Sequence, residues 1–456
     1  MINNNIILLT DSYKVSHAKQ YPPGTEKIYS YFESRGGEFD EVVFFGLQHF
    51  IKTYLEGQVI TKEKIDEAED FYTAHLGPGL FNRKGWEYIL ERHNGRLPVS
   101  IRSVPEGSVI PNKNVLMTVE NTDPECFWLT NYLETLLVQV WYPSTVATIS
   151  REMKKIIAGA LRKSGDLSGL PFKLHDFGCR GVSSMESAAL GGAGHLVNFQ
   201  GTDTVPALQL LRKSYEADMA GFSIPAAEHS TMTSWGRQGE SDAYENMLQQ
   251  FPTGLVAVVS DSWDIDNAVK NIWGGQLKAK ILERDGTLVI RPDSGDPVEV
   301  VPRLLTHLAR EFGGTTNEKG FFVLNDKVRL IQGDGINRQT LKGILDAVLD
   351  AGFSADNLAF GSGGGLLQQC NRDTLKFAFK CSSAVVNGEE REVYKQPKTA
   401  SWKASKRGRL KLVKIDDDYH TVSESASGED LLTEVFFNGS LMVTRFLNTI
   451  RERAEL

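Results

Sequence analysis

Residues 358–365 read LAFGSGGG, a mostly apolar run that ends in glycines broken by one serine. An apolar run that stops abruptly at glycine is typical of a buried strand entering a tight loop. The following stretch, LLQQCNRDTL (366–375), predicts a helix. A glycine loop between a strand and a helix presents backbone N–H groups to an anion such as phosphate. GSGGG matches neither the dinucleotide fingerprint nor the P-loop, so a close-packed turn is an equally good interpretation of this stretch alone.

The same design recurs along the middle of the chain. From about residue 172, short apolar runs end in Gly, Asp, Ser, Arg or His and precede amphipathic helices; besides LAFGSGGG they are FKLHDFG (172–178), HLVNFQGTD (195–203), GFSIPAAEH (221–229), GLVAVVSDSWD (254–264), TLVIRPDSGD (287–296), VRLIQGDG (328–335) and KFAFKCS (376–382). Strands alternating with helices at this spacing predict parallel βαβ units. About eight such units predict an irregular (β/α) barrel with its active site at the carboxyl ends of the strands.

Both chain ends have a different pattern. Residues 1–150 mix strand-like and helical segments, and residues 384–456 end in a predicted strand hairpin and a final helix. We therefore expect an α/β protein in which an additional α+β domain is built from the N- and C-terminal parts of the chain. The expected division is 1–150 completed by 384–456, with the barrel at 151–383.

Charge and cysteine usage limit the choice of partners and compartment. Lys and Arg total 50 against 58 Asp and Glu, a net charge of −8, which argues against a general nucleic-acid binder. A nucleic-acid hypothesis starts only at the basic run 402–414, whose alternation favours a strand and loop. No apolar run reaches the length of a membrane span, so we expect no membrane partner. The four cysteines lack CxxC or zinc spacing, and the N-terminal apolar run is too short for a signal peptide, which together predict a cytoplasmic protein.

The predicted strand-end loops bring anion- and hydroxyl-binding groups together. QGDG (332–335) and GSGGG (361–365) offer backbone donors for one phosphate, with the Ser362 hydroxyl beside them. Asp293 and Asp334 suit ribose hydroxyls or the hydration shell of Mg²⁺. Asp261 and Asp264 suit the same tasks, although a helix cap explains Asp261 equally well.

Cations, an aromatic ring and a histidine lie in the same loops. Arg180 and Arg291 are fixed cations suited to phosphate or a planar acceptor. Phe177 either stacks on a flat ring or belongs to the core. His229 follows Glu228 and is either a base or nucleophile oriented by a carboxylate, or a structural histidine.

Taken together, these motifs resemble one known family. DSYKVSHAKQYPPGT, HDFGCRGVSS, HLVNFQGTDT, PAAEHSTMTSWG, VVSDSWDI, IRPDSGDP, QGDGI, AFGSGGGLLQ and FKCS resemble, in order, the nicotinamide phosphoribosyltransferases, which belong with the type II phosphoribosyltransferases. The resemblance implies a homodimer with active sites at the interface. It also implies transfer of 5-phosphoribosyl from phosphoribosyl pyrophosphate to nicotinamide, with Mg²⁺, stimulated by ATP through a phosphohistidine.

The resemblance also implies roles for individual residues. The base would lie between Phe177 and the partner subunit's Tyr13, with its amide on Asp203 and Arg291. Gly333, Asp334, Gly363 and Gly364 would bind the ribose phosphate, and Asp293 would bind the ribose hydroxyls. Arg180 would lie along the pyrophosphate, with the partner subunit's Arg372 and the partner subunit's Lys380 as further cations. Mg²⁺ would bind near Asp264 and Asp293, and His229 would be phosphorylated.

Three alternatives stay open at this point. A nicotinate phosphoribosyltransferase would share the fold and differ in the choice between acid and amide. A barrel isomerase or aldolase acting on a sugar phosphate would need a strand-end lysine, for which Lys380 is the candidate. A non-catalytic binding protein would retain the barrel without the motif acids, all of which are present here.

Overall fold

The computed structural model describes residues 5–395 and 405–456, and the chain divides into two compact units. One, which we call the terminal unit, comprises the described parts of Met1–Thr145, Lys213–Ala217 and Asn371–Glu455. The other, the barrel unit, comprises Val146–Arg212 and Asp218–Cys370, with Leu456. The fold class expected from the sequence, a barrel joined to a domain made from both chain ends, is confirmed.

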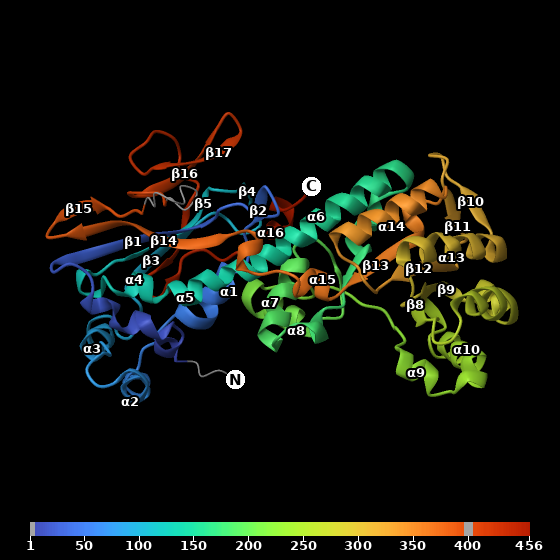
Figure 1. Ribbon diagram of the computed structural model, residues 1–456, viewed down its shortest axis with the longest axis horizontal. Coiled ribbons are helices and arrows are strands. Elements are labelled where there is room, and N and C mark those ends of the chain that lie inside the picture. Colours follow the sequence, from blue (N-terminus) through green and yellow to red (C-terminus); the bar gives the residue numbers. More distant parts are fainter. Residues whose placement is uncertain (1–4, 396–404) are drawn as a thin grey trace. The chain divides into compact units, whose positions relative to one another are not determined.

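A curled parallel sheet forms the barrel unit (Figure 1). Its strand order is β7 (Gly201–Thr202), β6 (Leu174–Asp176), β13 (Leu358–Ser362), β12 (Val328–Gln332), β9 (Asp285–Arg291) and β8 (Thr253–Val259). Parallel bridges Gly201–Phe222 and Ala226–Ala257 connect its two edges through residues 222–226. The irregular strand predicted at 221–229 therefore closes the barrel without forming a regular strand itself.

Helices follow the strands of the barrel as the βαβ pattern predicts. The described helices that lie wholly or mostly in this unit are α6 (Trp141–Ser164), η6 (Leu167–Phe172), η7 (Cys179–Gly181), α7 (Met185–His195), α8 (Val205–Tyr215), α9 (His229–Thr233), η8 (Arg237–Gly239), α10 (Glu240–Gln250), α11 (Ile265–Asn267), η9 (Ala268–Gln276), α12 (Lys278–Glu283), α13 (Pro297–Phe312), α14 (Arg338–Asp350), η10 (Ala355–Asn357) and α15 (Gly364–Leu367). A small hairpin, β10 (Gly314–Thr316) and β11 (Phe322–Leu324), follows α13.

The sequence shows why α13 begins and packs where it does. The Asp296 side chain accepts the N–H of Val298, and Pro297 occupies the first turn, where its missing N–H costs nothing. Leu304 and Leu308, one turn apart, are fully buried. Figure 1 shows α13 beside α14 and β12.

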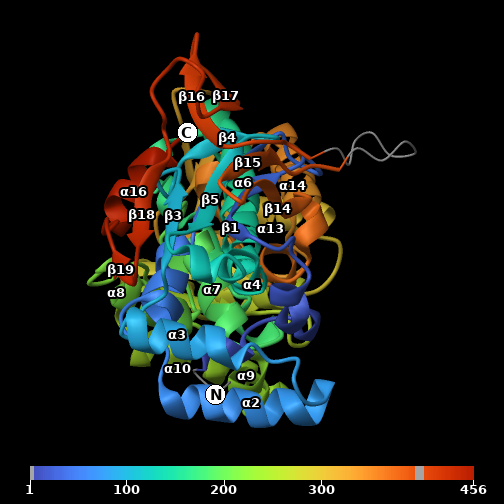
Figure 2. The same cartoon turned by 90° about the vertical axis from the view of Figure 1, so that its left-hand side faces the viewer.

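An antiparallel sheet dominates the terminal unit. Its strand order is β15 (Glu389–Glu392), β14 (Phe377–Val386), β1 (Thr25–Ser34), β5 (Val115–Asn121), β3 (Val99–Ser103), β18 (Thr433–Phe437) and β19 (Ser440–Leu441). Smaller pairs are β2 (Glu41–Val43) with β4 (Val109–Pro111), and β16 (Leu410–Ile415) with β17 (Asp418–Ser423). Figure 2 shows β18, from the C-terminal end, beside β3 from the N-terminal part.

The described helices of the terminal unit are short apart from α2. They are η1 (Ile6–Leu8), η2 (Ser12–Lys19), α1 (Leu47–Phe50), η3 (Ile51–Leu55), α2 (Lys62–Leu76), α3 (Arg83–Arg92), η4 (Pro124–Cys126), α4 (Leu129–Tyr132), α5 (Glu134–Leu137), η5 (Val138–Val140), η11 (Arg372–Thr374) and α16 (Leu447–Arg453). Within residues 5–395 and 405–456, no helix is both long and apolar enough to cross a bilayer.

Two sequence expectations differ from the structure, whereas the strand expected in the basic run is confirmed. KFAFKCS (376–382) is no barrel strand but belongs to β14, which pairs with β1, so the boundary placed at residue 384 lies at 371. The helix predicted at 366–375 is replaced by α15, only four residues long, and the separate turn η11. Of the basic run 402–414, residues 402–404 lie outside the described residues, and 410–415 form β16.

Candidate active site

One cavity of the barrel unit gathers seven of the residues singled out in the sequence. It has a volume of about 510 Å³ and is lined by Phe177, Cys179, Arg180, Met185, Asp203, Arg291, Asp293, Gly333 and Asp334. Phe177 follows β6, Arg291 ends β9 and Gly333 follows β12. The cavity therefore lies at the carboxyl ends of the barrel strands, where parallel barrels carry their active sites.

Phe177 forms one wall of the cavity, and glycines make room for its ring. Its N–H donates to the Ser362 carbonyl at 2.9 Å. A Cβ on Gly361 would lie 1.9 Å from the ring, and one on Gly333 would lie 3.4 Å away. The ring also packs against the barrel cluster that contains Ile331. The alternatives left open for Phe177, core residue and stacking surface, are therefore both compatible with its position.

Asp203 lies across the same cavity, directly after β7. It is exposed, its N–H donates to the Asp176 carbonyl at 3.0 Å, and one carboxylate oxygen accepts the hydroxyl of Ser223. A carboxylate fixed in this way accepts hydrogen bonds and repels other anions. Arg180, on the turn η7, is an exposed cation at the rim.

Arg291 brings a buried donor into the cavity. Its Nε lies 3.9 Å from Asp293 Oδ1, beyond hydrogen-bond distance, and has no hydrogen-bond partner among the described residues. Leaving a buried donor unpaired costs about 1–3 kcal/mol. Such a cost is tolerated where a ligand supplies the acceptor, so Arg291 marks a binding position.

Asp293 lies in a strongly acidic part of the cavity. Burial raises the pKa of its carboxyl above the ordinary value, and the nearby carboxylates of Asp261 and Asp334 raise it further, while Arg291 and His229 oppose them. Carboxylates that repel one another in a half-buried site favour a cation between them. Mg²⁺ is commonly held by one or two carboxylates, waters and substrate phosphates, and Asp293 with Asp334 fits that pattern.

His229 lies beside this cavity at the start of α9. Its Nε2 is 3.0 Å from Asp261 Oδ1, and its Nδ1 is 3.9 Å from Asp293 Oδ2. The second oxygen of Asp261 accepts the Asp293 N–H at 3.0 Å. Asp261 therefore orients the imidazole and leaves Nδ1 directed toward the cavity acids.

The two acids of SDSWD, Asp261 and Asp264, do not share one role, although the sequence suggested the same tasks for both. Asp264 caps α11, its carboxylate accepting the Asn267 N–H at 3.0 Å, and it is exposed and absent from the described cavity lining. Asp261, for which a cap was an equal alternative, contacts His229 instead. Spacing alone could not separate two acids three residues apart at a strand end.

The glycine loops after β12 and β13 are neighbours, because Gln332 pairs in parallel register with Phe360. Gly333 lines the cavity, and a Cβ on Gly364 would meet open space. The Ser362 hydroxyl donates to the Ile336 carbonyl at 2.7 Å and is buried. The expectation that this hydroxyl faces a bound phosphate is therefore wrong. The backbone of these loops is thus the part available to an anion.

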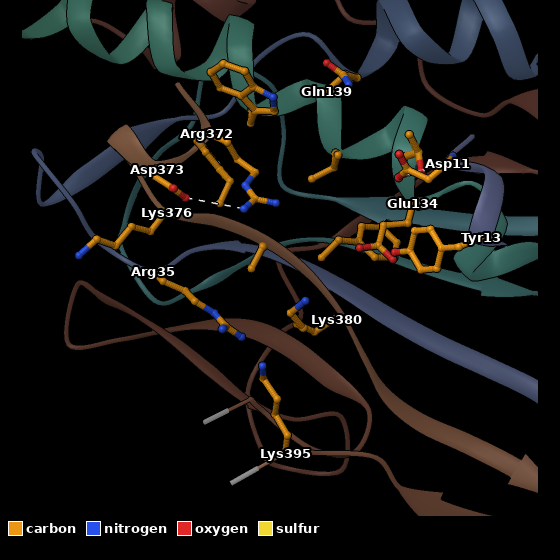
Figure 3. A pocket seen from close by; sticks show the side chains of 16 residues that line it. Asp11, Tyr13, Arg35, Glu134, Gln139, Arg372, Asp373, Lys376, Lys380 and Lys395 are labelled. Carbon is orange, nitrogen blue, oxygen red and sulfur yellow. Dashed lines mark hydrogen bonds and ion pairs between the residues drawn. The ribbon is translucent and has the colours of Figure 1, made fainter. Parts of the chain in front are cut away.

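The terminal unit carries a second cavity, of about 720 Å³ (Figure 3). Its lining includes Tyr13, Arg372 and Lys380, the residues that the resemblance assigns to a partner's active site. The sequence reasoning missed three further cations in the same lining: Arg35, Lys376 and Lys395. They lie far apart in the sequence, and only the folding of β1 beside β14 brings Arg35 near Lys380.

Positive charge in this second cavity is only partly compensated. Burial lowers the pKa of Lys380, and the neighbouring Arg35, Lys395 and Arg372 lower it further, while Glu134 opposes them. Figure 3 shows the charged ends of Arg35 and Lys395 pointing toward the same region, with Lys380 beside it. One Arg35 terminal nitrogen is buried without a hydrogen-bond partner among the described residues. This arrangement suits an anion with several charges. Because Lys380 belongs to β14 and follows no barrel strand, the aldolase alternative loses its catalytic lysine.

His93, Asp123 and Cys126 of the terminal unit form a cluster of metal-ligand type. Its carboxylate is already satisfied, however: Asp123 Oδ2 lies 2.7 Å from His93 Nε2 and accepts the Tyr88 hydroxyl, and Oδ1 accepts the Glu125 N–H. Burial raises the pKa of the Cys126 thiol to about 12. We therefore interpret this cluster as structural.

Comparison with known proteins gives the family. Residues 172–440 match the nicotinate phosphoribosyltransferase (NAPRTase) family, and residues 5–101 match the nicotinamide phosphoribosyltransferase N-terminal domain. A nicotinamide phosphoribosyltransferase from Xanthomonas campestris pv. campestris (strain 8004) is 52% identical over 464 residues, with 99% of this chain and 98% of that protein covered. The chain belongs to the nicotinamide phosphoribosyltransferase family.

A nicotinamide phosphoribosyltransferase from Acinetobacter baylyi (strain ATCC 33305 / BD413 / ADP1) is 35% identical to this chain. The match covers 97% of this chain and 95% of that protein. Among solved structures, the nicotinate-nucleotide pyrophosphorylase from Pyrococcus furiosus superposes with a TM-score of 0.64 at 15% identity, covering 100% of this chain and 96% of that one. At that identity the likeness shows the fold alone.

Proposed function

We propose that this chain transfers the 5-phosphoribosyl group from phosphoribosyl pyrophosphate to nicotinamide, giving nicotinamide mononucleotide and pyrophosphate. Family membership makes it a phosphoribosyl-transferring enzyme. The observation that carries the proposal is the single cavity in which Phe177, Asp203, Arg291 and Asp293 meet the Gly333–Asp334 loop. An aromatic wall, an amide acceptor, a buried cation and a backbone anion site are the groups that a pyridine amide and a ribose phosphate require.

The base subsite of the proposal consists of Phe177 and Asp203. A flat pyridine ring stacks on the phenyl face. The Asp203 carboxylate accepts an amide N–H, whereas nicotinate would place a second carboxylate against it. A site that pairs one polar group of its substrate discriminates strongly against an analogue that cannot pair. Arg291 Nε, which lacks a protein acceptor, supplies a donor for the amide oxygen.

The ribosyl transfer itself depends on charge. The pyridine nitrogen is a weak nucleophile, so the anomeric carbon must acquire positive character as pyrophosphate leaves. The Asp293 carboxylate stabilises that positive charge, and Arg180 compensates the leaving pyrophosphate. Mg²⁺, held by Asp293 and Asp334, would neutralise phosphate oxygens. Asp264, committed to capping α11, is dropped from the proposed metal set.

ATP stimulation through His229 belongs to the same proposal. Asp261 occupies Nε2, so Nδ1 is the atom that would accept the phosphoryl group. A phosphohistidine at that position would add anionic oxygens near Asp293, where a divalent cation is expected. The arrangement of His229, Asp261 and Asp293 supports this step.

We further propose a homodimer in which the second cavity completes the partner's site. Tyr13, Arg372 and Lys380 line the cavity of the terminal unit and are absent from the described lining of the barrel cavity. Tyr13 is 61% exposed, as a ring that covers a partner's base would be before assembly. The only partly compensated cations suit the pyrophosphate. None of the four cysteines, all of which lie in the described residues, forms a disulfide, which fits the proposed cytoplasmic location.

The experiment that tests the function compares both bases. The protein is incubated with phosphoribosyl pyrophosphate, Mg²⁺ and either nicotinamide or nicotinate, with and without ATP, and the mononucleotides are followed by mass. We expect nicotinamide mononucleotide, formed faster with ATP. Preferential use of nicotinate would favour the alternative, a nicotinate phosphoribosyltransferase, whose family residues 172–440 match. Product from neither base would refute both.

A further inference from the structure

A buried carboxylate that the proposed reaction does not use lies directly behind the base subsite. Asp176 is the last residue of β6 and is fully buried. One of its carboxylate oxygens accepts the Gly178 N–H at 2.7 Å. This hydrogen bond closes a turn whose middle residue is Phe177, so it fixes the direction in which the Phe177 ring leaves the strand.

The second oxygen of the same carboxylate holds the other wall of the subsite. It accepts the Thr202 hydroxyl at 3.4 Å, and that hydroxyl accepts the Thr204 N–H at 2.9 Å. The residue between Thr202 and Thr204 is Asp203, whose own N–H donates to the Asp176 carbonyl at 3.0 Å. Phe177 and Asp203 are therefore each bracketed by hydrogen bonds that lead to one residue.

Helix α7 closes over this carboxylate. A Cβ on Gly192 would lie 3.0 Å from Asp176 Oδ2 and 2.7 Å from the Ala207 methyl group, so α7 approaches so closely only because the residue is glycine. Burial raises the pKa of Asp176 to about 6, and the nearby charged group that acts on it, Asp203, has the same sign. A buried carboxylate without a cation is costly.

The free-energy cost of burying this carboxylate indicates that its charge has a role of its own. An asparagine could make comparable hydrogen bonds to Gly178 and Thr202 without a charge, so a purely structural anchor does not need the acid. What the acid adds is negative charge behind Asp203. That charge opposes an anionic base such as nicotinate and leaves a neutral amide unaffected.

We propose that Asp176 is a positioning residue of the base subsite, which holds Phe177 and Asp203 at a fixed separation and strengthens the preference for nicotinamide over nicotinate. The inference rests on the proposed function, because it assigns the base to Phe177 and Asp203. It adds a residue that touches neither substrate.

The test separates the two substrates kinetically. In Asp176→Asn, which keeps comparable hydrogen bonds and loses only the charge, we expect the KM values for nicotinamide and for phosphoribosyl pyrophosphate to stay within about twofold, and the nicotinamide-to-nicotinate ratio of kcat/KM to fall about tenfold because nicotinate becomes a better substrate. Thr202→Val removes the contact to the second oxygen and also the acceptor of the Thr204 N–H, so it loosens Asp203 and should raise the KM for nicotinamide about tenfold while the KM for phosphoribosyl pyrophosphate stays unchanged. It carries the test if the Asn variant does not fold.

Ser164→Ala is the matched control. Ser164 is fully buried in the barrel unit, donates to the Ala160 carbonyl and accepts the Ala355 N–H. Its loss should lower the melting temperature and leave both KM values unchanged. Equal rises of the nicotinamide and phosphoribosyl pyrophosphate KM values in Thr202→Val, or an unchanged base preference in Asp176→Asn, would overturn the inference. An inactive wild-type protein would instead overturn the proposed function.

Discussion

The imidazole of His229 and the carboxylate of Asp261 lie 3.0 Å apart, joined through Nε2. Asp261 is 3% exposed in its side chain and holds the Asp293 backbone with its other oxygen. One buried acid thus couples a candidate phosphoryl acceptor to a candidate ribose-binding carboxylate. This relationship predicts which atom of His229 reacts.

With ATP and Mg²⁺, we expect phosphate on Nδ1 of His229, because Asp261 occupies Nε2. Phosphorus NMR distinguishes the two isomers, and mass spectrometry locates the acid-labile phosphate. Asp261→Asn keeps an acceptor for the Asp293 N–H but loses the charge that stabilises the imidazolium, so phosphorylation should slow about a hundredfold. Phosphate on Nε2, or an unchanged rate in Asp261→Asn, would contradict this orientation.

Asp203→Ser should weaken the choice between amide and acid. Serine keeps a hydrogen-bonding group but removes the charge that repels nicotinate, so the nicotinamide KM should rise about tenfold while nicotinate becomes a better substrate. The measurement is kcat/KM for both bases. A preference unchanged from the wild type would show that Asp203 does not read the base.

Gly361→Ala should damage the base subsite without touching a polar group. The new methyl group would lie 1.9 Å from the Phe177 ring, so the ring must move. We expect the nicotinamide KM to rise about tenfold or more, since base–aromatic stacking is commonly worth 1–3 kcal/mol. Gly343→Ala, within α14 and with no Cβ contact nearer than 3.6 Å, is the matched control. It should be neutral or stabilise the protein by about 1 kcal/mol. An unchanged KM in Gly361→Ala would mean that the ring does not hold the base.

Part of the fold and of the candidate site could be predicted from the sequence. The alternation of strands and helices predicted the barrel, and the strand-end clusters predicted the residues of the cavity, because parallel strands bring their carboxyl ends to one face. Periodicity could not show that 376–382 pairs with β1, since a short apolar strand reads the same in either sheet. Nor could it show that Asp261 and Asp264 point to different partners.

Residues that depend on long-range contacts were missed for the same reason. Arg35 and Lys395 carry no local motif, and they join the second cavity because β1 and β15, the strands that they follow, both pair with β14. Asp176 belongs to the motif HDFG, in which the sequence indicated a role only for its neighbour Phe177. The signal that could have found it is the alternation of β6, which places Asp176 on the same buried face as Leu174.

Protonation of Asp176 should make the stability of the protein depend on pH. Its pKa is about 6 in the folded chain against an ordinary value of 3.8, so between these values the folded state binds more protons, and stability falls as pH rises. The shift amounts to about 3 kcal/mol. Relative to Asp176→Asn, the wild type should therefore lose about that much free energy of unfolding between pH 4 and pH 7. Urea titrations of both proteins across that range measure it. A constant difference between them would show that the carboxyl does not titrate there.

Complementation between subunits tests the shared site. Asp293→Ala disables the barrel cavity, and Arg372→Ala disables the second cavity, so each homodimer should be nearly inactive. If Arg372 acts on the partner's barrel, a hybrid dimer retains one intact site, formed by the barrel of the Arg372→Ala subunit and the Arg372 of the Asp293→Ala subunit. Hybrids purified through two different affinity tags should then recover about half of wild-type activity, as expected for one of two equivalent sites in a symmetric dimer. Were Arg372 to act on its own barrel, both sites of the hybrid would lack one residue, and its activity would stay at the level of the parents.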